Sequence, residues 1–207
     1  RDPMGVKPLF YARRGGSFFF ASELKSLLCF PEIPPQVDAR GLYDLLFLGP
    51  GRTPGYGVFR GVYELEPGTC GYFDETGLHL SRYWKLHDRP CTDSFESASE
   101  KTRWLLEDSI RRQLVSDVPI GTFLSGGLDS SIISAVAAKY KGPINTYSVD
   151  YRDNDRYFTA TKFQPNSDSD YIGLMERHIH ANGHRVILDT DELVSGLFEA
   201  AEARDLP

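Results

Sequence analysis

The sequence predicts an α/β protein with a parallel sheet in its C-terminal part and β-hairpins in its N-terminal part. From about residue 118 onward, apolar segments of strand length alternate with segments of helical period, which is typical of βαβ units. Before residue 85, short apolar runs flank glycine-containing turns, which is the pattern of antiparallel hairpins. The length of 207 residues fits one large or two small domains, and the hydrophobic content of 41% is ordinary for a globular protein.

Two hairpins are expected in the N-terminal part. The first joins residues 9–12 to residues 17–21, and the second joins residues 70–74 to residues 78–84. A two-stranded hairpin is only marginally stable alone in water, so we expect further sheet to cover the first one.

Two short helices are expected between these hairpins. Ser22 and Asp38 each precede an apolar run, and residues of these types cap helices well. The second helix is expected to gather three leucines on one face: Leu42, Leu45 and Leu46.

Residues 85–90 lack any hydrophobic periodicity, and we expect the domain boundary there, with domains over residues 1–88 and 89–207. A helix over about residues 94–115 follows. Its buried stripe is predicted from residues at three- and four-residue steps, namely Phe95, Ala98, Thr102, Leu105, Leu106, Ile110 and Leu114. The parallel sheet beyond it is expected to use strands at 118–124, 144–151 and 185–188, with helices over 132–140 and 170–181 and from 191. Residues 150–168 form a long polar loop in this scheme.

The stretch over residues 125–131, Ser-Gly-Gly-Leu-Asp-Ser-Ser, lies between a predicted strand and a predicted helix. The first N–H groups of a helix have no intrahelical partner and carry partial positive charge. Gly126 and Gly127 allow close approach of an anion, and the serines add hydroxyl donors. The sequence therefore predicts an anion site of the phosphate-binding kind.

Asp129 is the unexpected member of this stretch, because a carboxylate repels a polyphosphate. A Mg²⁺ ion between them removes the conflict, since magnesium prefers one or two carboxylates plus phosphate oxygens. No lysine follows the glycines, which excludes the P-loop ending in Gly-Lys-Ser/Thr. The alternative is a serine- and glycine-rich turn without a ligand, which the full seven-residue pattern disfavours.

Residues 125–131 closely resemble the pyrophosphate-binding loop of the N-type ATP pyrophosphatases, enzymes that split ATP between its α- and β-phosphates. Residues 1–11, followed by residues 20–25, resemble the late part of the glutaminase domain of the asparagine synthetases. The resemblance covers essentially all of the chain, although residues 153–168 are weakly patterned.

This resemblance implies two domains and one overall reaction. Residues 1–88 would be the C-terminal part of an αββα glutaminase domain, rich in β-hairpins, and residues 89–207 the N-terminal part of a parallel-sheet, Rossmann-like ATP-pyrophosphatase domain. In the family, Mg-ATP adenylates the β-carboxylate of aspartate and releases pyrophosphate. Ammonia from glutamine then displaces AMP to give asparagine.

The resemblance also implies the binding residues. Val149 matches the position whose backbone meets adenine, and Asp129 matches the acid associated with Mg²⁺. The full set expected to bind ATP or pyrophosphate is Leu124, Ser125, Gly126, Gly127, Leu128, Asp129, Ser130, Ser131 and Val149. No catalytic residue is expected within the chain, since the family's cysteine nucleophile would precede Arg1 and its second acidic loop and lysine would follow residue 207. We therefore expect an interior piece of a longer enzyme, inactive alone.

Composition limits the other partners. With 23 Lys and Arg against 29 Asp and Glu, the net charge is −6, which argues against a broad nucleic-acid surface. No apolar run approaches the roughly 20 residues of a membrane span, and a cytoplasmic protein is expected. Cys29, Cys70 and Cys91 form no CxxC pair, so neither a zinc site nor a disulfide framework is indicated. The expected partners are aspartate, glutamine and ATP, and a homodimer is left open.

Three alternatives share the loop. A β-lactam-forming relative has the same architecture, although residues 7–9 and 20–23 favour asparagine synthetase. A nucleotide-binding module without catalysis would keep the loop alone. A tRNA-modifying pyrophosphatase would carry a basic surface, which the net charge of −6 does not suggest.

Overall fold

The computed structural model describes residues 1–49, 51–162 and 166–205. These residues form two compact units. The first comprises Arg1–Arg89 together with the C-terminal segment from Gly196, and the second comprises Pro90–Ser195.

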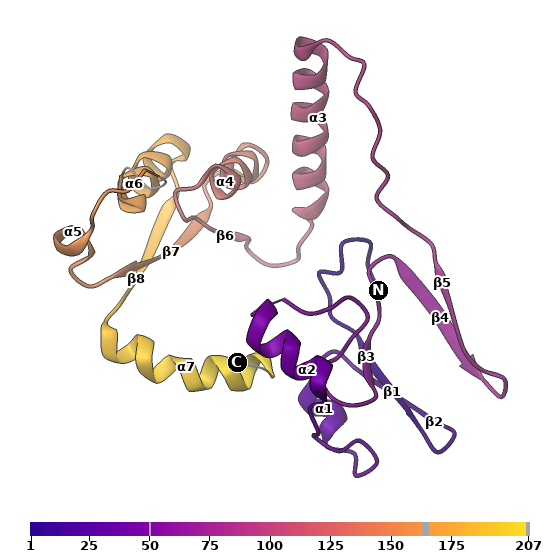
Figure 1. Ribbon diagram of the computed structural model, residues 1–207. Helices are drawn as coiled ribbons and strands as arrows, with labels where there is room; N and C mark the ends of the chain where they lie inside the picture. The colour runs from indigo at the N-terminus through magenta and orange to yellow at the C-terminus, as the bar shows by residue number, and fades with distance from the viewer. Residues whose placement is uncertain (50, 163–165, 206–207) are drawn as a thin grey trace. The chain divides into compact units, whose positions relative to one another are not determined.

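The first unit is built on antiparallel strands. A three-stranded sheet has the order β2 (Ser17–Ala21), β1 (Phe10–Arg14) and β3 (Val62–Glu64) (Figure 1). The second predicted hairpin forms a separate two-stranded sheet from β4 (Thr69–Asp74) and β5 (Gly77–Arg82). Both predicted hairpins are confirmed, and the first gains β3 from a run too short to be recognised by periodicity.

The short helices of this unit test the two predicted caps. Helix α1 (Leu24–Leu28) has Glu23 at its N-cap without a side-chain hydrogen bond, so the predicted Ser22 cap is wrong because the helix begins one residue too late for it. Helix α2 (Ala39–Tyr43) confirms the Asp38 cap, whose Oδ1 accepts from the N–H groups of Arg40 at 3.1 Å and Gly41 at 3.0 Å.

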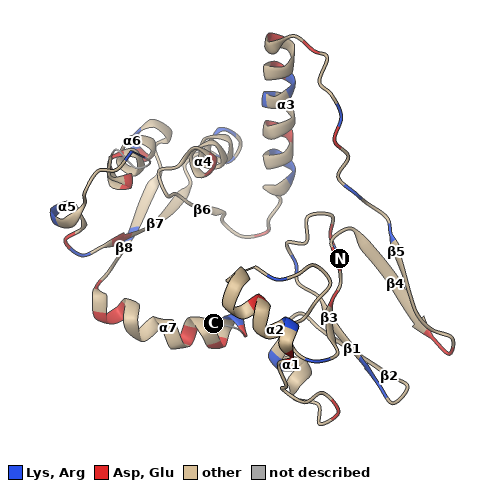
Figure 2. Ribbon diagram, viewed as in Figure 1, with Lys and Arg blue, Asp and Glu red and all other residues tan. Residues whose placement is uncertain are grey.

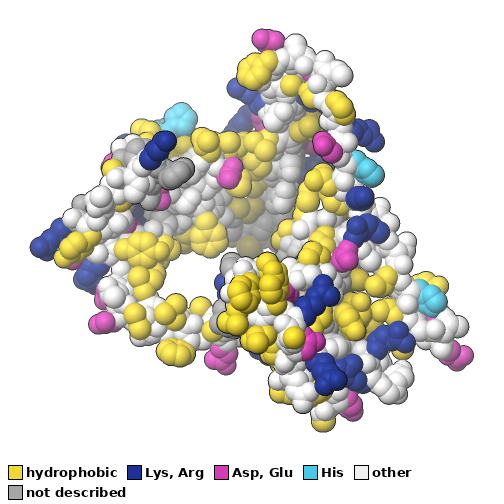
Figure 3. All heavy atoms as spheres, viewed as in Figure 1, with side chains coloured by type: hydrophobic (Ala, Val, Ile, Leu, Met, Phe, Trp, Pro, Cys, Tyr) yellow, Lys and Arg dark blue, Asp and Glu magenta, His cyan; other side chains and the backbone are white. Residues whose placement is uncertain are grey.

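Of the three leucines expected on one helix face, only Leu42 lies in α2, and Leu45 and Leu46 lie in the turn that follows it. Leu42 and Leu46 are 52% and 67% exposed, and in Figure 3 apolar side chains gather on the surface over α2. This turn is π-helical, η1 (Asp44–Leu48), and it rotates Leu46 relative to its place in a regular helix. Asp44 is buried instead, and its carboxylate accepts from the N–H and hydroxyl groups of Thr53 at 3.0 and 2.6 Å.

Helix α1 covers one face of the three-stranded sheet and completes the core of the first unit. Leu24 and Leu27 lose nearly all of their solvent exposure there. The buried side chains of this core are Phe10, Ala12, Leu24, Leu27, Ile33 and Val62.

The second unit contains the predicted parallel sheet. Strands β6 (Gly121–Phe123), β7 (Asn145–Tyr151) and β8 (Asn182–Leu188) pair in parallel in that order. The connecting helices α4 (Leu128–Lys141) and α6 (Asp168–Ile179) lie on the same side of the sheet (Figure 1). The chain thus has the predicted α/β fold class.

The remaining helices differ in how well they were predicted. Helix α7 (Thr190–Arg204) agrees with the expected start near residue 191. A short helix, α5 (Asn154–Tyr157), interrupts the predicted loop over residues 150–168; residues 163–165 of that loop lie outside the described residues.

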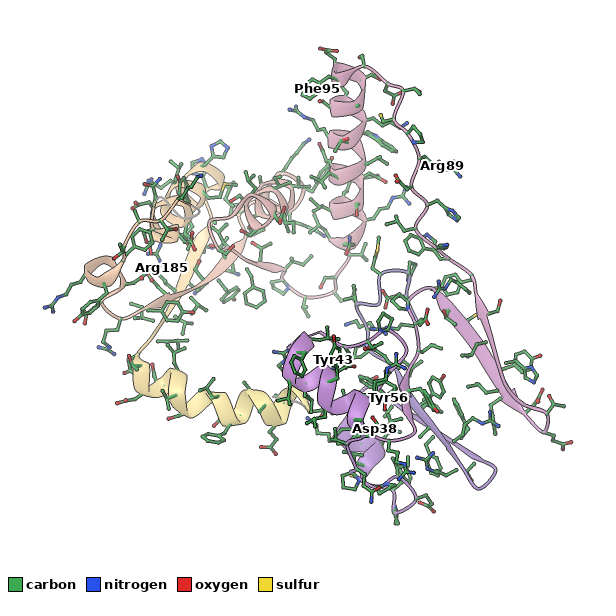
Figure 4. The ribbon with its side chains drawn as sticks, viewed as in Figure 1. Asp38, Tyr43, Tyr56, Arg89, Phe95 and Arg185 are labelled. Atoms are coloured by element: carbon green, nitrogen blue, oxygen red, sulfur yellow. The ribbon has the colours of Figure 1, made fainter. Side chains whose placement is uncertain are left out.

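Helix α3 (Phe95–Gln113) does not bury its predicted stripe. Leu114 is buried just after the helix and Ile110 packs beside it, against Ala137 and Ala138 of α4. Ala98 of the stripe is half-buried and Phe95, Thr102, Leu105 and Leu106 are exposed, up to 83% at Phe95 (Figure 4), because only the C-terminal turns of α3 enter a core. Both signs of charge occur along α3 (Figure 2). Among the described residues, no helix is long and apolar enough to cross a membrane.

Leu27→Ala should lower the free energy of unfolding of the first unit by about 2–5 kcal/mol, the usual range for a buried leucine that leaves a cavity. Leu42→Ala, at an exposed position of the same unit, should change it by less than about 0.5 kcal/mol. Urea denaturation followed by circular dichroism measures both. Equal effects of the two variants would contradict the described core.

Candidate functional site

The loop over residues 125–131 follows Leu124, which is buried and hydrogen-bonded at the carboxyl end of the parallel sheet. Leu124 is 1% exposed, and its N–H donates to the carbonyl oxygen of Tyr147 in β7 at 2.9 Å. In parallel α/β sheets, ligands bind at this edge of the sheet. The loop therefore lies where a ligand site is expected in such a fold.

Helix α4 begins earlier than predicted. Its first residue is Leu128 and its N-cap is Gly127, whose backbone is extended at φ −73° and ψ 164°. The expected start at residue 132 is wrong because the glycine pair already completes the turn. Leu128, Asp129 and Ser130 consequently lie in the first helical turn, where backbone N–H groups have no intrahelical acceptor. The N–H of Ser131 already donates to the carbonyl oxygen of Gly127 at 3.1 Å.

Two serine hydroxyls brace the loop. The Oγ of Ser130 donates to the carbonyl oxygen of Gly127 at 3.1 Å and accepts from the N–H of Ser125 at 3.2 Å. The hydroxyls of Ser125 and Ser130 are also 3.1 Å apart. Ser130 thus fixes the loop from within, in addition to offering a hydroxyl near the helix N-terminus.

Gly126 is required by its conformation and by its neighbours. Its φ is +81°, a region that L side chains rarely adopt. A Cβ atom at this position would lie 2.8 Å from the carbonyl oxygen of Asp168 and 3.2 Å from the Cβ of Tyr171. At Gly127 the nearest atom to such a Cβ would be the Ser125 Oγ at 3.5 Å, an ordinary contact.

Asp129 projects from the first turn of α4 and is exposed. It has no hydrogen bond or ion pair with another residue in the described part of the chain. No group of three or more His, Cys, Asp or Glu residues is arranged to hold a metal among the described residues. A single carboxylate fits Mg²⁺ when an anionic ligand supplies further oxygens, and Asp129 is free to take that role.

Val149 lies on β7, at the same edge of the sheet as the loop. Phe123 pairs with Tyr147 in the parallel register, so Val149 is level with Ser125, just beyond the end of β6. Its side chain is 54% exposed. The structure therefore brings Val149 and the loop, which are distant in sequence, to one edge.

Asp150, the next residue along β7, belongs to the site although the sequence patterns did not indicate it. Its carboxylate accepts from the hydroxyl of Ser169 at 2.7 Å, the Nδ2 of Asn154 at 3.1 Å and the N–H of Tyr151 at 2.9 Å. The hydrogen bond from Ser169 is the main reason that the pKa of Asp150 lies below its ordinary value. An acidic residue at the carboxyl end of a predicted strand was the signal that could have identified it.

An open pocket of about 570 Å³ adjoins the loop between α4 and α6. Mainly apolar side chains of α6 form one wall, and the glycines of the loop form part of the other. Its lining residues are Gly126, Gly127, Leu128, Ser131, Tyr171, Leu174, Met175 and His178.

Gly126→Ala should shift the loop and destabilise the second unit, because the new Cβ would meet a backbone carbonyl and the residue would need a positive φ. Gly127→Ala should fold normally, since its backbone is extended and the space is open. Hydrogen exchange of residues 124–131 measures the difference. Equal exchange in the two variants would contradict the contact between Gly126 and α6.

Asp150→Asn should reduce stability at neutral pH by an amount that shrinks in acid. A folded-state pKa below 3.8 means that the carboxylate contributes stability above that pH, and the contribution is lost as the pH falls through the folded-state pKa. Urea unfolding of wild type and Asp150→Asn at neutral pH and below pH 3.8 measures this. Asp129→Asn is the control, because the Asp129 side chain has no hydrogen bond or ion pair with a described residue. A difference that stayed constant with pH would exclude the stabilising role of Asp150.

Two family models match the chain. The asparagine synthase model matches residues 101–207, and the glutamine amidotransferase domain model matches residues 1–84. The first match includes all residues of the loop and the whole parallel sheet.

Curated relatives are similar over most or all of the chain. Asparagine synthetase (glutamine-hydrolyzing) 3 of Bacillus subtilis is 46% identical over 212 residues, covering 100% of this chain and 34% of that protein. Putative asparagine synthetase (glutamine-hydrolyzing) 2 of Methanocaldococcus jannaschii is 33% identical over 73% of this chain and 30% of that protein. A putative asparagine synthetase of Mycobacterium bovis is 33% identical over 100% of this chain and 31% of that protein. The chain spans about a third of the length of these relatives. With more than half of its residues matched by the asparagine synthase model, the chain belongs to the asparagine synthase family.

Proposed function

We propose that the chain is part of a glutamine-dependent asparagine synthetase, an ATP-dependent carbon–nitrogen ligase, and that residues 125–131 hold the pyrophosphate portion of ATP. The observation that carries the proposal is the glycine loop between β6 and α4, which presents the unpaired N–H groups of a helix N-terminus at the carboxyl end of a parallel sheet. The family membership and the names of the relatives supply the reaction.

In this reaction the β-carboxylate of aspartate attacks the α-phosphate of ATP, pyrophosphate leaves, and ammonia derived from glutamine displaces AMP. The backbone N–H groups at the start of α4 and the hydroxyl of Ser125 would bind the β- and γ-phosphates. The hydroxyl of Ser130 would join them by turning its single proton from the Gly127 carbonyl to a phosphate oxygen. Gly126 and Gly127 let these oxygens approach the backbone, since neither carries a Cβ. Charge that develops on the leaving pyrophosphate is then stabilised by donors already in place.

Asp129 would hold Mg²⁺ against the phosphates, and the ion would neutralise part of their charge. The support is its position beside the helix N-terminus without a competing partner in the described part of the chain. Leu124 and Val149 would bound the nucleotide at the sheet edge, with the backbone of Val149 meeting adenine. The support is the parallel register of β6 and β7, which places Val149 level with the start of the loop just after Leu124.

We further propose that residues 1–88 are the C-terminal part of an αββα glutamine amidotransferase domain and residues 89–207 the N-terminal part of a Rossmann-like, pyrophosphatase-type synthetase domain. The family matches over residues 1–84 and 101–207 support this division. The compact-unit boundary between Arg89 and Pro90 agrees with it, whereas the segment from Gly196 groups with the first unit. The glutaminase nucleophile and the remaining synthetase residues would lie in the other two thirds of the full-length protein.

Asp129→Asn in the full-length protein should lower asparagine synthesis by roughly 10²-fold or more, the scale for losing one preorganised electrostatic group. Glutaminase activity should persist, because it needs no ATP. Pyrophosphate binding measured by calorimetry should weaken in Mg²⁺ but hardly change in chelator, since the substitution removes a like charge and leaves the donors.

Ser130→Ala is the matched variant in the same turn. It removes the hydroxyl that braces the loop, so pyrophosphate binding should weaken with or without Mg²⁺, by about 1.5–3 kcal/mol if the hydroxyl also reaches the phosphate. Equal losses for Asp129→Asn in Mg²⁺ and in chelator would refute the metal role. Wild-type protein that binds neither ATP nor pyrophosphate would refute the proposed function itself.

A further inference from the structure

The first turn of α6 lies directly behind the glycine loop. The carbonyl oxygen of Asp168 and the Cβ of Tyr171 occupy the space that a side chain at position 126 would need. Gly126 holds its positive φ against this surface. The position of α6 therefore limits where Gly126, and the N–H groups that follow it, can lie.

Asp150 holds this turn of α6 in place. Its Oδ2 accepts from the hydroxyl of Ser169, the second residue of α6, at 2.7 Å. Asp150 itself is fixed, because β7 is the central strand and its backbone pairs with β8 as far as Tyr151. The hydrogen bond thus connects the most constrained strand of the sheet to the turn that supports Gly126.

Asp150 also accepts a hydrogen bond from a side chain outside α6. Its Oδ1 accepts from the Nδ2 of Asn154 at 3.1 Å, and Asn154 belongs to α5. Removing Asn154 would therefore loosen the segment after β7 while leaving the link to α6 intact. Asn154→Ala is therefore a control variant for Ser169→Ala, because it removes a hydrogen bond to Asp150 without breaking the one that joins Asp150 to α6.

We propose that Asp150 and Ser169 are a positioning pair that sets the conformation of the glycine loop through the first turn of α6. The inference rests on the proposed phosphate-binding role of that loop. Neither residue needs to touch the ligand. When their hydrogen bond is lost, the turn carrying Asp168 and Tyr171 moves away from Gly126, and the N–H donors no longer converge on one anion.

The test uses the full-length protein with inorganic pyrophosphate as the probe, titrated calorimetrically in Mg²⁺. Ser169→Ala should raise the Kd for pyrophosphate by about tenfold or more, in line with the steep cost of misplaced binding groups. Ser169→Thr retains the hydroxyl and should bind as tightly as wild type. Asn154→Ala should also bind as tightly, because it leaves the link between Asp150 and α6 in place.

A double-mutant cycle separates positioning from general destabilisation. Ser169→Ala should have no further effect on the Kd in an Asp150→Ala background, because the two residues act through one hydrogen bond. Kinetics should show a raised KM for ATP with an unchanged KM for glutamine. Additive losses in the cycle would overturn the proposal, and so would Ser169→Ala protein that binds pyrophosphate like wild type.

Hydrogen exchange without any ligand distinguishes failure of the pair from failure of the proposed function. The amides of Gly126 and Gly127 should exchange faster in Ser169→Ala than in wild type or Asn154→Ala. Unchanged exchange overturns the positioning role whatever the loop binds. If Ser169→Ala does not fold, the same measurement is made in Asp150→Ala, which removes the acceptor of the hydrogen bond. Faster exchange in a protein whose wild type binds no pyrophosphate overturns the phosphate-binding role instead.

Discussion

Because β6 and β7 pair in parallel, residue by residue, the end of one strand lies beside the end of the other. This constraint brings Leu124 and the loop to the level of Val149 and Asp150, although about 25 residues of chain separate the two segments. Only three residues of β6 take part in this pairing. The hydrogen bond from the Leu124 N–H to the Tyr147 carbonyl oxygen joins the two strands at the point where the backbone turns into the loop. The glycine conformations, the start of α4 and the contact with α6 all follow from that turning point.

β7 has an unusual distribution of side chains. Thr146 and Ser148 face the helices and are buried, whereas Tyr147 and Val149 are 43% and 54% exposed. The hydroxyl of Thr146 donates to Glu176 of α6 at 3.2 Å, so α6 is held to this strand by hydrogen bonds at two points. The small side chains of Thr146 and Ser148 leave room for the helices, and the hydrogen bond of Thr146 fixes the position of α6 along the strand.

The sequence contained enough information for the fold class, the parallel strands and the loop, because these depend on local periodicity and on residue types next to each other. The same holds for Asp38, whose cap involves residues two and three positions away. Burial was harder to predict. Phe95 and Leu46 have helical spacing, but whether such residues are covered depends on which distant elements reach them and, at Leu46, on a π-helical turn that no simple pattern reveals.

Within the candidate site, residue types were enough to predict the hydrogen-bond donors. The residues that hold the loop in position could not be predicted, because they are far apart in the sequence. Ser130 was expected to serve a ligand, and its role as an internal brace depends on the position of the Gly127 carbonyl. Asp150 and Ser169 are 19 residues apart, and nothing in the intervening polar segment indicates that they meet. A hydrogen bond between residues so far apart in the sequence can be identified only from the positions of β7 and α6 in the folded chain.

The exposed face of β7 and β8 has a practical consequence for handling the chain. Tyr147, Val149, Tyr151 and Val186 leave about half of their side-chain surface in water, and β8 is an edge strand of the described sheet. An apolar sheet face beside an open edge favours self-association. A solution of the 207-residue chain alone would therefore contain assemblies whose size grows with concentration, and ligand affinities measured on it would reflect that association as well as the site.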